Sequence, residues 1–176
     1  MARTYVITGS ASGIGLATAE KLKSLGNTVI GVDIHNADVV ADLSTPQGRV
    51  DAAKKAIQLS NNSIDAIIAC AGLAHPIATT VSVNYFGVTE FLNELLPTLT
   101  KSKTPRVVIT SSVASIMPNS AELVEAMCVN DEAKAVKIAQ GLVDAAAGGE
   151  QLIYGSTKRA ISRWIRQQCL KPQWAG

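Results

Sequence analysis

The sequence has few aromatic side chains and no long apolar run. Phe, Trp and Tyr make up 4% of its 176 residues, so the core has to be built mainly from aliphatic side chains. No apolar run approaches the roughly 18 residues that cross a membrane. The first residues also lack the longer apolar stretch and the cleavage site of a secretory signal. We therefore expect no membrane partner and a cytoplasmic location.

Cysteine and histidine are scarce as well. Cys70, Cys128 and Cys169 are odd in number and far apart, without the spacing of a zinc site or a disulfide framework. This pattern fits reduced thiols in the cytoplasm, and Cys70 is expected to be a small buried hydrophobic residue. His35 and His75 have no partners at ligand spacing, so no metal is expected.

A strong excess of charge of one sign is missing too. Lys plus Arg number 16 and Asp plus Glu number 14, which gives a net charge of +2. This leaves no strong field to hold nucleic acid or an anionic membrane. Apolar residues at 47% and charged residues at 17% exclude a disordered chain. The length predicts a single domain over residues 1–176.

Short apolar runs alternate with segments of helical period. Strands are predicted over 4–8, 28–34, 39–43, 64–70 and 106–110, and helices over 13–25, 45–59 and 80–99. The strand runs lack polar alternation, which is typical of parallel strands covered on both faces. This order predicts an α/β fold with a doubly wound parallel sheet.

A helical insertion is predicted over about 116–149, before a longer helix from about 150 to 170. Two short helices fit the insertion, and Asn119 with Glu122 predicts a capping box for the first. Their apolar side chains have to be buried somewhere. These are Ala121, Leu123, Val124, Met127, Val136, Ile138, Leu142 and Val143.

A glycine-rich segment follows the first strand and opens the first helix. Its turn contains Gly9, Ser12, Gly13, Ile14 and Gly15. Glycines there let the backbone approach a pyrophosphate, while the helix N-terminus offers free N–H groups and a positive dipole. The alternative is an ordinary glycine-rich turn, but the strand–turn–helix context favours dinucleotide binding.

Asp33 ends the second strand, 18 residues after Gly15. A carboxylate at this place accepts hydrogen bonds from the adenosine ribose and repels a 2′-phosphate. No Arg or Lys stands at positions 10–12 or 34 to neutralise such a phosphate, which favours NAD over NADP. The alternative is an Asp that begins a turn.

Tyr154 and Lys158 lie four residues apart in a predicted helix and so share a face. A buried ammonium beside a phenol stabilises the phenolate, so this pair could move a proton near neutral pH. The spacing alone is weak evidence, because ordinary pairs on a helix surface have it too.

The motifs occur together in a fixed order. They are Thr8-Gly-x-x-x-Gly13-x-Gly15, Cys70-Ala71-Gly72, Asn84, Ser112 and Tyr154-x-x-x-Lys158. The ordered set resembles the short-chain dehydrogenase/reductase family, which implies a Rossmann-like fold. Segments 41–45, 81–87 and 108–115 and the insertion are similar to the bacterial 3α-hydroxysteroid dehydrogenase/carbonyl reductases of that family.

The resemblance implies four catalytic residues. Tyr154 would be the acid/base at the substrate oxygen, and Lys158 would assist it and bind the nicotinamide ribose. Ser112 would hydrogen-bond the carbonyl oxygen, and Asn84 would hold a water in a proton relay to Lys158. Without the resemblance, Ser112 reads as a strand-end turn residue and Asn84 as a helix cap.

The resemblance also implies further cofactor contacts. Asp42 and Leu43 would contact the adenine, and Cys70-Ala71-Gly72 would pass beside the cofactor, as would Tyr154 and Lys158. Relatives usually begin that motif with two Asn, which Ala69 and Cys70 replace here. Backbone contacts survive the change, but a side-chain hydrogen bond is lost.

The expected function is therefore NAD-dependent hydride transfer between nicotinamide and a secondary alcohol or ketone. The resemblance implies a 3α-hydroxysteroid, a 3-oxosteroid or another hydrophobic alcohol as substrate, and a homo-oligomer, dimer or tetramer, as the assembly. A sugar-nucleotide epimerase shares Tyr-x-x-x-Lys but usually spaces its glycines differently.

Family members continue beyond the helix of Tyr154 into further strands. The sequence is therefore expected to be C-terminally short for the family, with 106–110 as an open sheet edge. This leaves an alternative function, a non-catalytic dinucleotide-binding protein or an inactive fragment of such an enzyme.

Overall fold

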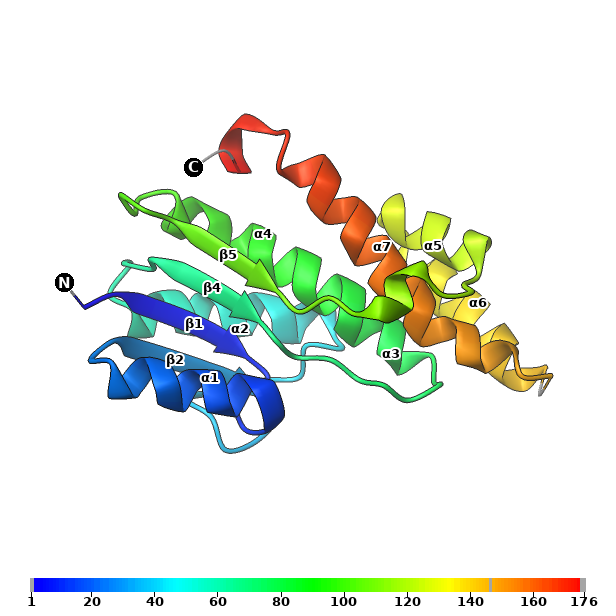
Figure 1. The fold of residues 1–176 in the computed structure, drawn as a ribbon, viewed down its shortest axis with the longest axis horizontal. Helices are drawn as coiled ribbons and strands as arrows, with labels where there is room; N and C mark the ends of the chain where they lie inside the picture. Colours follow the sequence, from blue (N-terminus) through cyan, green and yellow to red (C-terminus); the bar gives the residue numbers. More distant parts are fainter. Residues whose placement is uncertain (1, 146, 175–176) are drawn as a thin grey trace. The chain divides into compact units, whose positions relative to one another are not determined.

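Five parallel strands form the sheet in the computed structural model, which describes residues 2–145 and 147–174. They are β1 (Thr4–Thr8), β2 (Thr28–Asp33), β3 (Val39–Val40), β4 (Ala66–Ala69) and β5 (Arg106–Ile109). The strand order is β3-β2-β1-β4-β5. Figure 1 shows its part β2-β1-β4-β5. The doubly wound α/β prediction is confirmed.

The chain divides into two compact units. Among the described residues, the first unit contains the sheet and comprises residues 2–71 and Glu90–Thr110. The second unit comprises Gly72–Thr89, residues 111–145 and residues 147–174. The α-helices are α1 (Gly13–Ser24), α2 (Pro46–Leu59), α3 (Thr79–Val81), α4 (Gly87–Leu99), α5 (Ala121–Cys128), α6 (Glu132–Asp144) and α7 (Leu152–Gln168). A π-helix spans Ser82–Phe86, and short 3₁₀ turns span Val113–Ile116, Gly149–Gln151 and Pro172–Trp174.

The order of the strands reverses direction at β1. The chain moves from β1 outward to β2 and β3, then returns to β4 and β5 on the other side. Because such crossovers are right-handed, α1 lies on one face of the sheet while α2 and α4 lie on the other (Figure 1). In sheets of this type, ligands bind outside the carboxyl ends of the strands at the point where the strand order reverses.

An aliphatic core holds α1 against the sheet, as the composition predicts. Ile7, Ala19 and Val29 are buried together, and Tyr5, Leu22 and Ile68 pack around them. The edge strand β5 differs from the expectation of strands covered on both faces, because Val108 is 55% exposed.

Several boundaries differ from the predicted ones. β3 contains Val39–Val40 only, because the chain turns after it to cap α2 with Thr45, whose Oγ1 accepts a hydrogen bond from Gly48 N. The capping box predicted for Asn119 and Glu122 is wrong. Ser120 is the N-cap of α5 instead, and its Oγ accepts from the backbone N–H of Leu123.

The two predicted insertion helices pack within the second unit. α5 contacts α7 and α6, and α6 also contacts the π-helix. Leu123, Val124 and Met127 are buried, whereas Ala121 is exposed. Within residues 2–145 and 147–174, no helix combines the length and apolarity needed to cross a membrane.

Candidate active site

The glycine-rich turn follows β1 and leads into α1. Gly9 has φ +71°, and a methyl group there would lie 2.8 Å from the backbone nitrogen of Ala71. A methyl group on Gly15 would collide with the carbonyl oxygen of Gly9. These two positions therefore need glycine for a tight turn that presents its backbone at the end of the sheet.

The first turn of α1 is suited to an anion. Ser12 is the N-cap, yet its side chain makes no capping hydrogen bond with any described residue, and the turn carries no acidic residue. Its N–H groups and the helix dipole therefore favour a negatively charged group. A pyrophosphate fits this chemistry.

Asp33 ends β2 and holds the glycine-rich turn. Its Oδ2 accepts a hydrogen bond from Ala11 N at 2.9 Å, and its Oδ1 accepts from Ile34 N at 2.7 Å. Gly9 N donates to the carbonyl of Val32 at 2.9 Å. Asp33 thus lies beside the turn, as its spacing predicts. Its bond to Ala11 is a second role that sequence reasoning missed.

The segment after β3 continues this edge. Ala41 N donates to the carbonyl of Asp33 at 2.9 Å, which places the next residues beside that carboxylate. Asp42 is exposed and its Oδ1 accepts from Ser44 N at 2.8 Å. Leu43 is buried. The side chain of Asp42 is therefore accessible to a ligand, while the side chain of Leu43 is part of the core.

The segment after β4 is tied to the end of β1 by Thr8. Its carbonyl accepts from Cys70 N at 3.2 Å, and its Oγ1 accepts from Ala71 N at 3.1 Å. The Cys70 thiol is half-buried and its Sγ accepts a hydrogen bond from Thr110 Oγ1 at 3.3 Å, which corrects the expectation of a buried hydrophobic residue. Gly72 belongs to the second unit, where a methyl group on it would lie 3.2 Å from Asn84 Oδ1.

The second unit contains all four predicted catalytic residues. Tyr154 and Lys158 lie on α7, and Lys158 Nζ is 5.7 Å from the centre of the Tyr154 ring. Lys158 is buried, with 7% of its surface exposed, and Tyr154 is half-buried. The ammonium of Lys158 is therefore buried near the Tyr154 ring.

Gly155 brings α7 close to the segment that follows Ser112. A methyl group on Gly155 would lie 3.0 Å from the carbonyl oxygen of Pro118 and 3.3 Å from that of Ala114. Ser112 caps the 3₁₀ turn of this segment, and its Oγ accepts from Ala114 N at 3.2 Å. Because that contact uses the hydroxyl as acceptor, its proton stays available for donation.

Asn84 lies in the π-helix, a rare element that often marks functional sites. Its Oδ1 accepts from Leu73 N at 2.7 Å, and its Nδ2 donates to Leu73 O at 2.8 Å. Nδ2 also donates to Thr157 Oγ1 at 3.2 Å, and Thr157 Oγ1 donates to Tyr154 O at 2.7 Å. The side chain of Asn84 is thus engaged in holding Leu73 and the helix of Tyr154.

Three residues between Tyr154 and Lys158 were missed by sequence reasoning: Gly155, Ser156 and Thr157. Ser156 Oγ donates to Leu152 O at 2.8 Å and accepts from Ser120 N at 2.9 Å. A glycine, a serine and a threonine in the middle of a helix are the available signal, since all three are poor helix formers.

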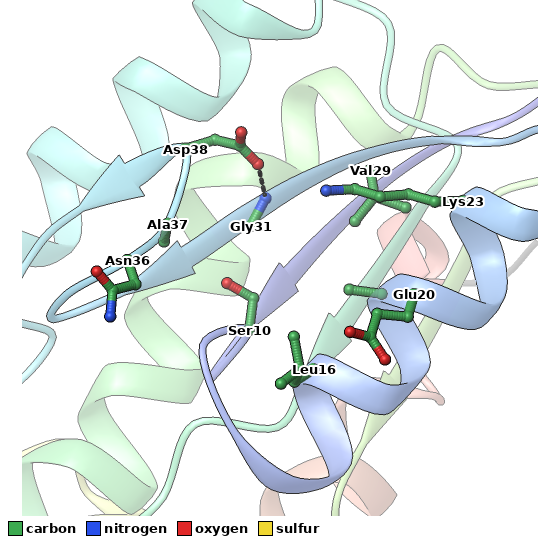
Figure 2. A pocket seen from close by; sticks show the side chains of 10 residues that line it. Ser10, Leu16, Glu20, Lys23, Val29, Gly31, Asn36, Ala37 and Asp38 are labelled. Carbon is green, nitrogen blue, oxygen red and sulfur yellow. Dashed lines mark hydrogen bonds between the residues drawn. The ribbon is translucent and has the colours of Figure 1, made fainter.

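A groove of about 310 Å³ lies between α1 and the loop after β2 (Figure 2). Ser10, Leu16 and Lys23 line it, and Asp38 Oδ2 accepts a hydrogen bond from Gly31 N at 2.7 Å within it. Its described lining includes none of the predicted site residues.

No group of three potential metal-ligating side chains occurs in the described parts of the chain.

The chain is similar in sequence to known proteins. The chain is 38% identical over 168 residues to the 3-alpha-hydroxysteroid dehydrogenase/carbonyl reductase of Comamonas testosteroni, which covers 93% of this chain and 64% of the relative. It is 42% identical over 101 residues to the coniferyl-alcohol dehydrogenase of a Pseudomonas species, over 52% of this chain and 37% of the relative. The chain therefore spans less than two thirds of the length of these curated relatives.

A solved structure agrees with the computed fold. The 3-alpha-hydroxysteroid dehydrogenase of Pseudomonas sp. B-0831, complexed with NADH, matches with a TM-score of 0.88 and 39% identity. The match covers 98% of this chain and 74% of the other. The model of the short chain dehydrogenase family matches residues 3–124, from β1 through the π-helix of Asn84 into α5. With the turn after β1, the strand order and these matches in agreement, the chain belongs to the short-chain dehydrogenase family.

Proposed function

We propose that this protein is an NAD-dependent oxidoreductase that interconverts a secondary alcohol and a ketone. The observation that carries the proposal is the pair on α7, with buried Lys158 Nζ 5.7 Å from the centre of the Tyr154 ring. The pair places a cation beside a phenol that can act as the acid/base group for an alcohol.

The adenosine end of the cofactor would be held by the first unit. The N–H groups at the start of α1, with Gly9, Gly13 and Gly15, would bind the pyrophosphate. The Asp33 carboxylate would accept hydrogen bonds from the ribose hydroxyls and would repel a 2′-phosphate. Since no Arg or Lys stands at positions 10–12 or 34, we infer a preference for NAD over NADP. The remaining contacts of the first unit would come from Ser12, Ile14, Asp42, Leu43, Cys70 and Ala71, and Gly72 of the second unit would add another.

The bound nicotinamide would supply or accept the hydride. The Tyr154 hydroxyl would give a proton to the substrate oxygen, or take it back in the oxidation direction. The Ser112 hydroxyl, whose proton is free to donate, would hydrogen-bond the same oxygen and stabilise negative charge on it. Lys158 would stabilise the Tyr154 phenolate, and Asn84 would hold a water in the proton relay that returns the proton to Lys158.

Hydrophobic substrates are favoured by the segment that follows Ser112. Val113, Ile116 and Met117 are exposed there, and α7 packs against this turn next to Tyr154. The names of the two curated relatives refer to a hydroxysteroid and to coniferyl alcohol. We therefore propose a 3α-hydroxysteroid or 3-oxosteroid first and an aromatic alcohol second.

We propose a cytoplasmic location, which the thiols support. Cys70, Cys128 and Cys169 are free cysteines, which suits the reducing cytoplasm. We place the protein there, as a homo-oligomer.

The test is an incubation of the protein with NAD or NADP and a panel of steroid, aromatic and aliphatic secondary alcohols. Formation of reduced nicotinamide with NAD and a steroid alcohol is the expected result. NADH binding without turnover of any member of the panel would contradict catalysis and favour a dinucleotide-binding protein.

A further inference from the structure

Arg49 is the largest fully buried side chain of the first unit, with an exposed fraction of 0%. Its Nε donates to Leu43 O at 2.9 Å and its Nη2 donates to Ser44 O at 3.0 Å. Its Nη1 donates to Glu90 Oε2 at 2.7 Å, so a carboxylate from α4 balances the buried charge. One guanidinium on α2 thus holds two consecutive carbonyl groups of the segment after β3.

Burying an ion pair is a poor way to gain stability. Removing both charges from water costs much of what their attraction returns, and apolar residues of the same size often do as well. What the guanidinium offers is geometry, because its planar donors fix the direction of each acceptor. The pair therefore serves to define the conformation of Leu43 and Ser44.

The held segment lies at the edge that would receive adenosine. β3 pairs with β2 so that Val40 lies opposite Asp33, and Ala41 N donates to Asp33 O. The next residue, Asp42, is exposed and bonds Ser44 N through its Oδ1. The backbone N–H of Ser44 is therefore bonded to Asp42, and its backbone carbonyl is bonded to Arg49.

We propose that Arg49, held by Glu90, is a positioning residue that preforms the adenine end of the dinucleotide site. Without it, residues 42–44 would have to be ordered when the ligand binds, and that ordering would weaken binding. The inference rests on the proposed function, since it takes the ligand to be an adenine dinucleotide.

The experiment compares the wild-type protein with R49M, R49K and E90Q. Calorimetry gives the Kd for ADP-ribose, which is the cofactor without its nicotinamide ring. Amide hydrogen exchange gives the protection of residues 41–45. R163M is the matched control, because it removes an Arg whose Nη1 lies 3.5 Å from Glu125 in the second unit. All variants are compared below their melting temperatures.

R49M is expected to weaken ADP-ribose binding about tenfold, which is roughly the cost of ordering one backbone residue when the ligand binds. Amide hydrogen exchange of residues 41–45 should be faster in R49M than in the wild-type protein. The KM of R49M for NAD should rise by a larger factor than its kcat falls. R49K, which keeps the charge without the planar donors, and E90Q should give intermediate losses, and R163M none. If R49M does not fold, the ADP-ribose affinity and amide hydrogen exchange of R49K and E90Q are compared with those of the wild-type protein instead.

Folded Arg49 variants that bind ADP-ribose as tightly as wild type would overturn the inference, even if they melt earlier. If the wild-type protein itself does not bind ADP-ribose, the proposed function fails instead. Exchange at 41–45 then decides the role of Arg49, and unchanged protection in R49M would overturn that role as well.

Discussion

The side-chain amide of Asn84 donates to the hydroxyl of Thr157 at 3.2 Å, and both residues are buried. The same hydroxyl donates to the carbonyl of Tyr154 at 2.7 Å. One threonine therefore links the π-helix to the turn of α7 that carries the proposed acid/base. Thr157 directly precedes Lys158, so its two hydrogen bonds help to fix the part of α7 that carries Tyr154 and Lys158.

Replacing Thr157 by Val should lower both activity and stability. The variant keeps the branched shape. Asn84 Nδ2 would still donate to Leu73 O, but its second N–H would lose its buried acceptor, which costs about 1–3 kcal/mol. We expect turnover to fall and the free energy of unfolding to decrease by that amount, measured by steady-state kinetics and urea unfolding. Thr100→Val is the control, since Thr100 makes the same type of bond to Pro97 O on an exposed surface. An equal effect of the two changes would contradict this link.

Tyr154→Phe should remove catalysis and leave dinucleotide binding intact. Only the hydroxyl is lost, and a general acid/base contributes roughly 10²–10⁴ in rate. Turnover and NADH affinity are measured side by side. Tyr5→Phe in β1 serves as the control and should keep its activity. A Tyr154→Phe variant with near-normal turnover would show that another group moves the proton.

Asp33→Asn should reduce the preference for NAD over NADP. The amide oxygen can still accept from Ala11 N, while the bond from Ile34 N is lost, and the amide carries no charge to repel a 2′-phosphate. Asp33→Ala should also weaken NAD binding, because it removes the acceptor that holds the glycine-rich turn. The ratio of kcat/KM for the two cofactors is the measurement. Equal use of both by the wild-type protein would refute the assignment.

Gly155→Ala should perturb the segment that carries Ser112. The new methyl group would lie 3.0 Å from Pro118 O, so helix or segment has to shift at a cost of about 1–3 kcal/mol. Gly141→Ala in α6 is the matched control, because a methyl group there meets nothing within 4 Å. The control should be neutral or stabilised by up to about 1 kcal/mol. Thermal unfolding distinguishes the two, and a stabilised Gly155→Ala would contradict the close packing.

Asp65 should contribute to stability in a pH-dependent way. Hydrogen bonds from Ser102 Oγ and Thr4 N hold the pKa of this carboxyl below its usual value. A group with a lowered folded-state pKa stabilises the protein above its unfolded pKa of about 4, and this contribution is lost as the pH falls through the folded value. Ser102→Ala should therefore destabilise the protein at neutral pH, and the difference from wild type should shrink below about pH 4. A difference that stays constant with pH would exclude Asp65 as its source.

The local elements could be predicted because their signals lie within a few residues. β1 and α1 begin where their sequence patterns begin, and Thr45 with Pro46 starts α2. The position of Asp33 at the end of β2 and the shared face of Tyr154 and Lys158 follow from the strand boundary and the helical repeat. Hydrophobic period and turn chemistry are enough for such features.

The contacts that connect these elements depended on the tertiary structure. Arg49 meets Glu90 across 41 positions, and Asn84 meets Thr157 across 73, separations at which no sequence period operates. The start of α5 shows how the two levels interact. Asn119 and Ser120 are both good caps, but the backbone N–H of Ser120 also donates to Ser156 Oγ on α7. The sequence pattern is enough to predict that a helix begins near residue 120. Packing against α7 selects Ser120 as its N-cap, because only the folded chain brings the Ser156 hydroxyl within reach of Ser120 N.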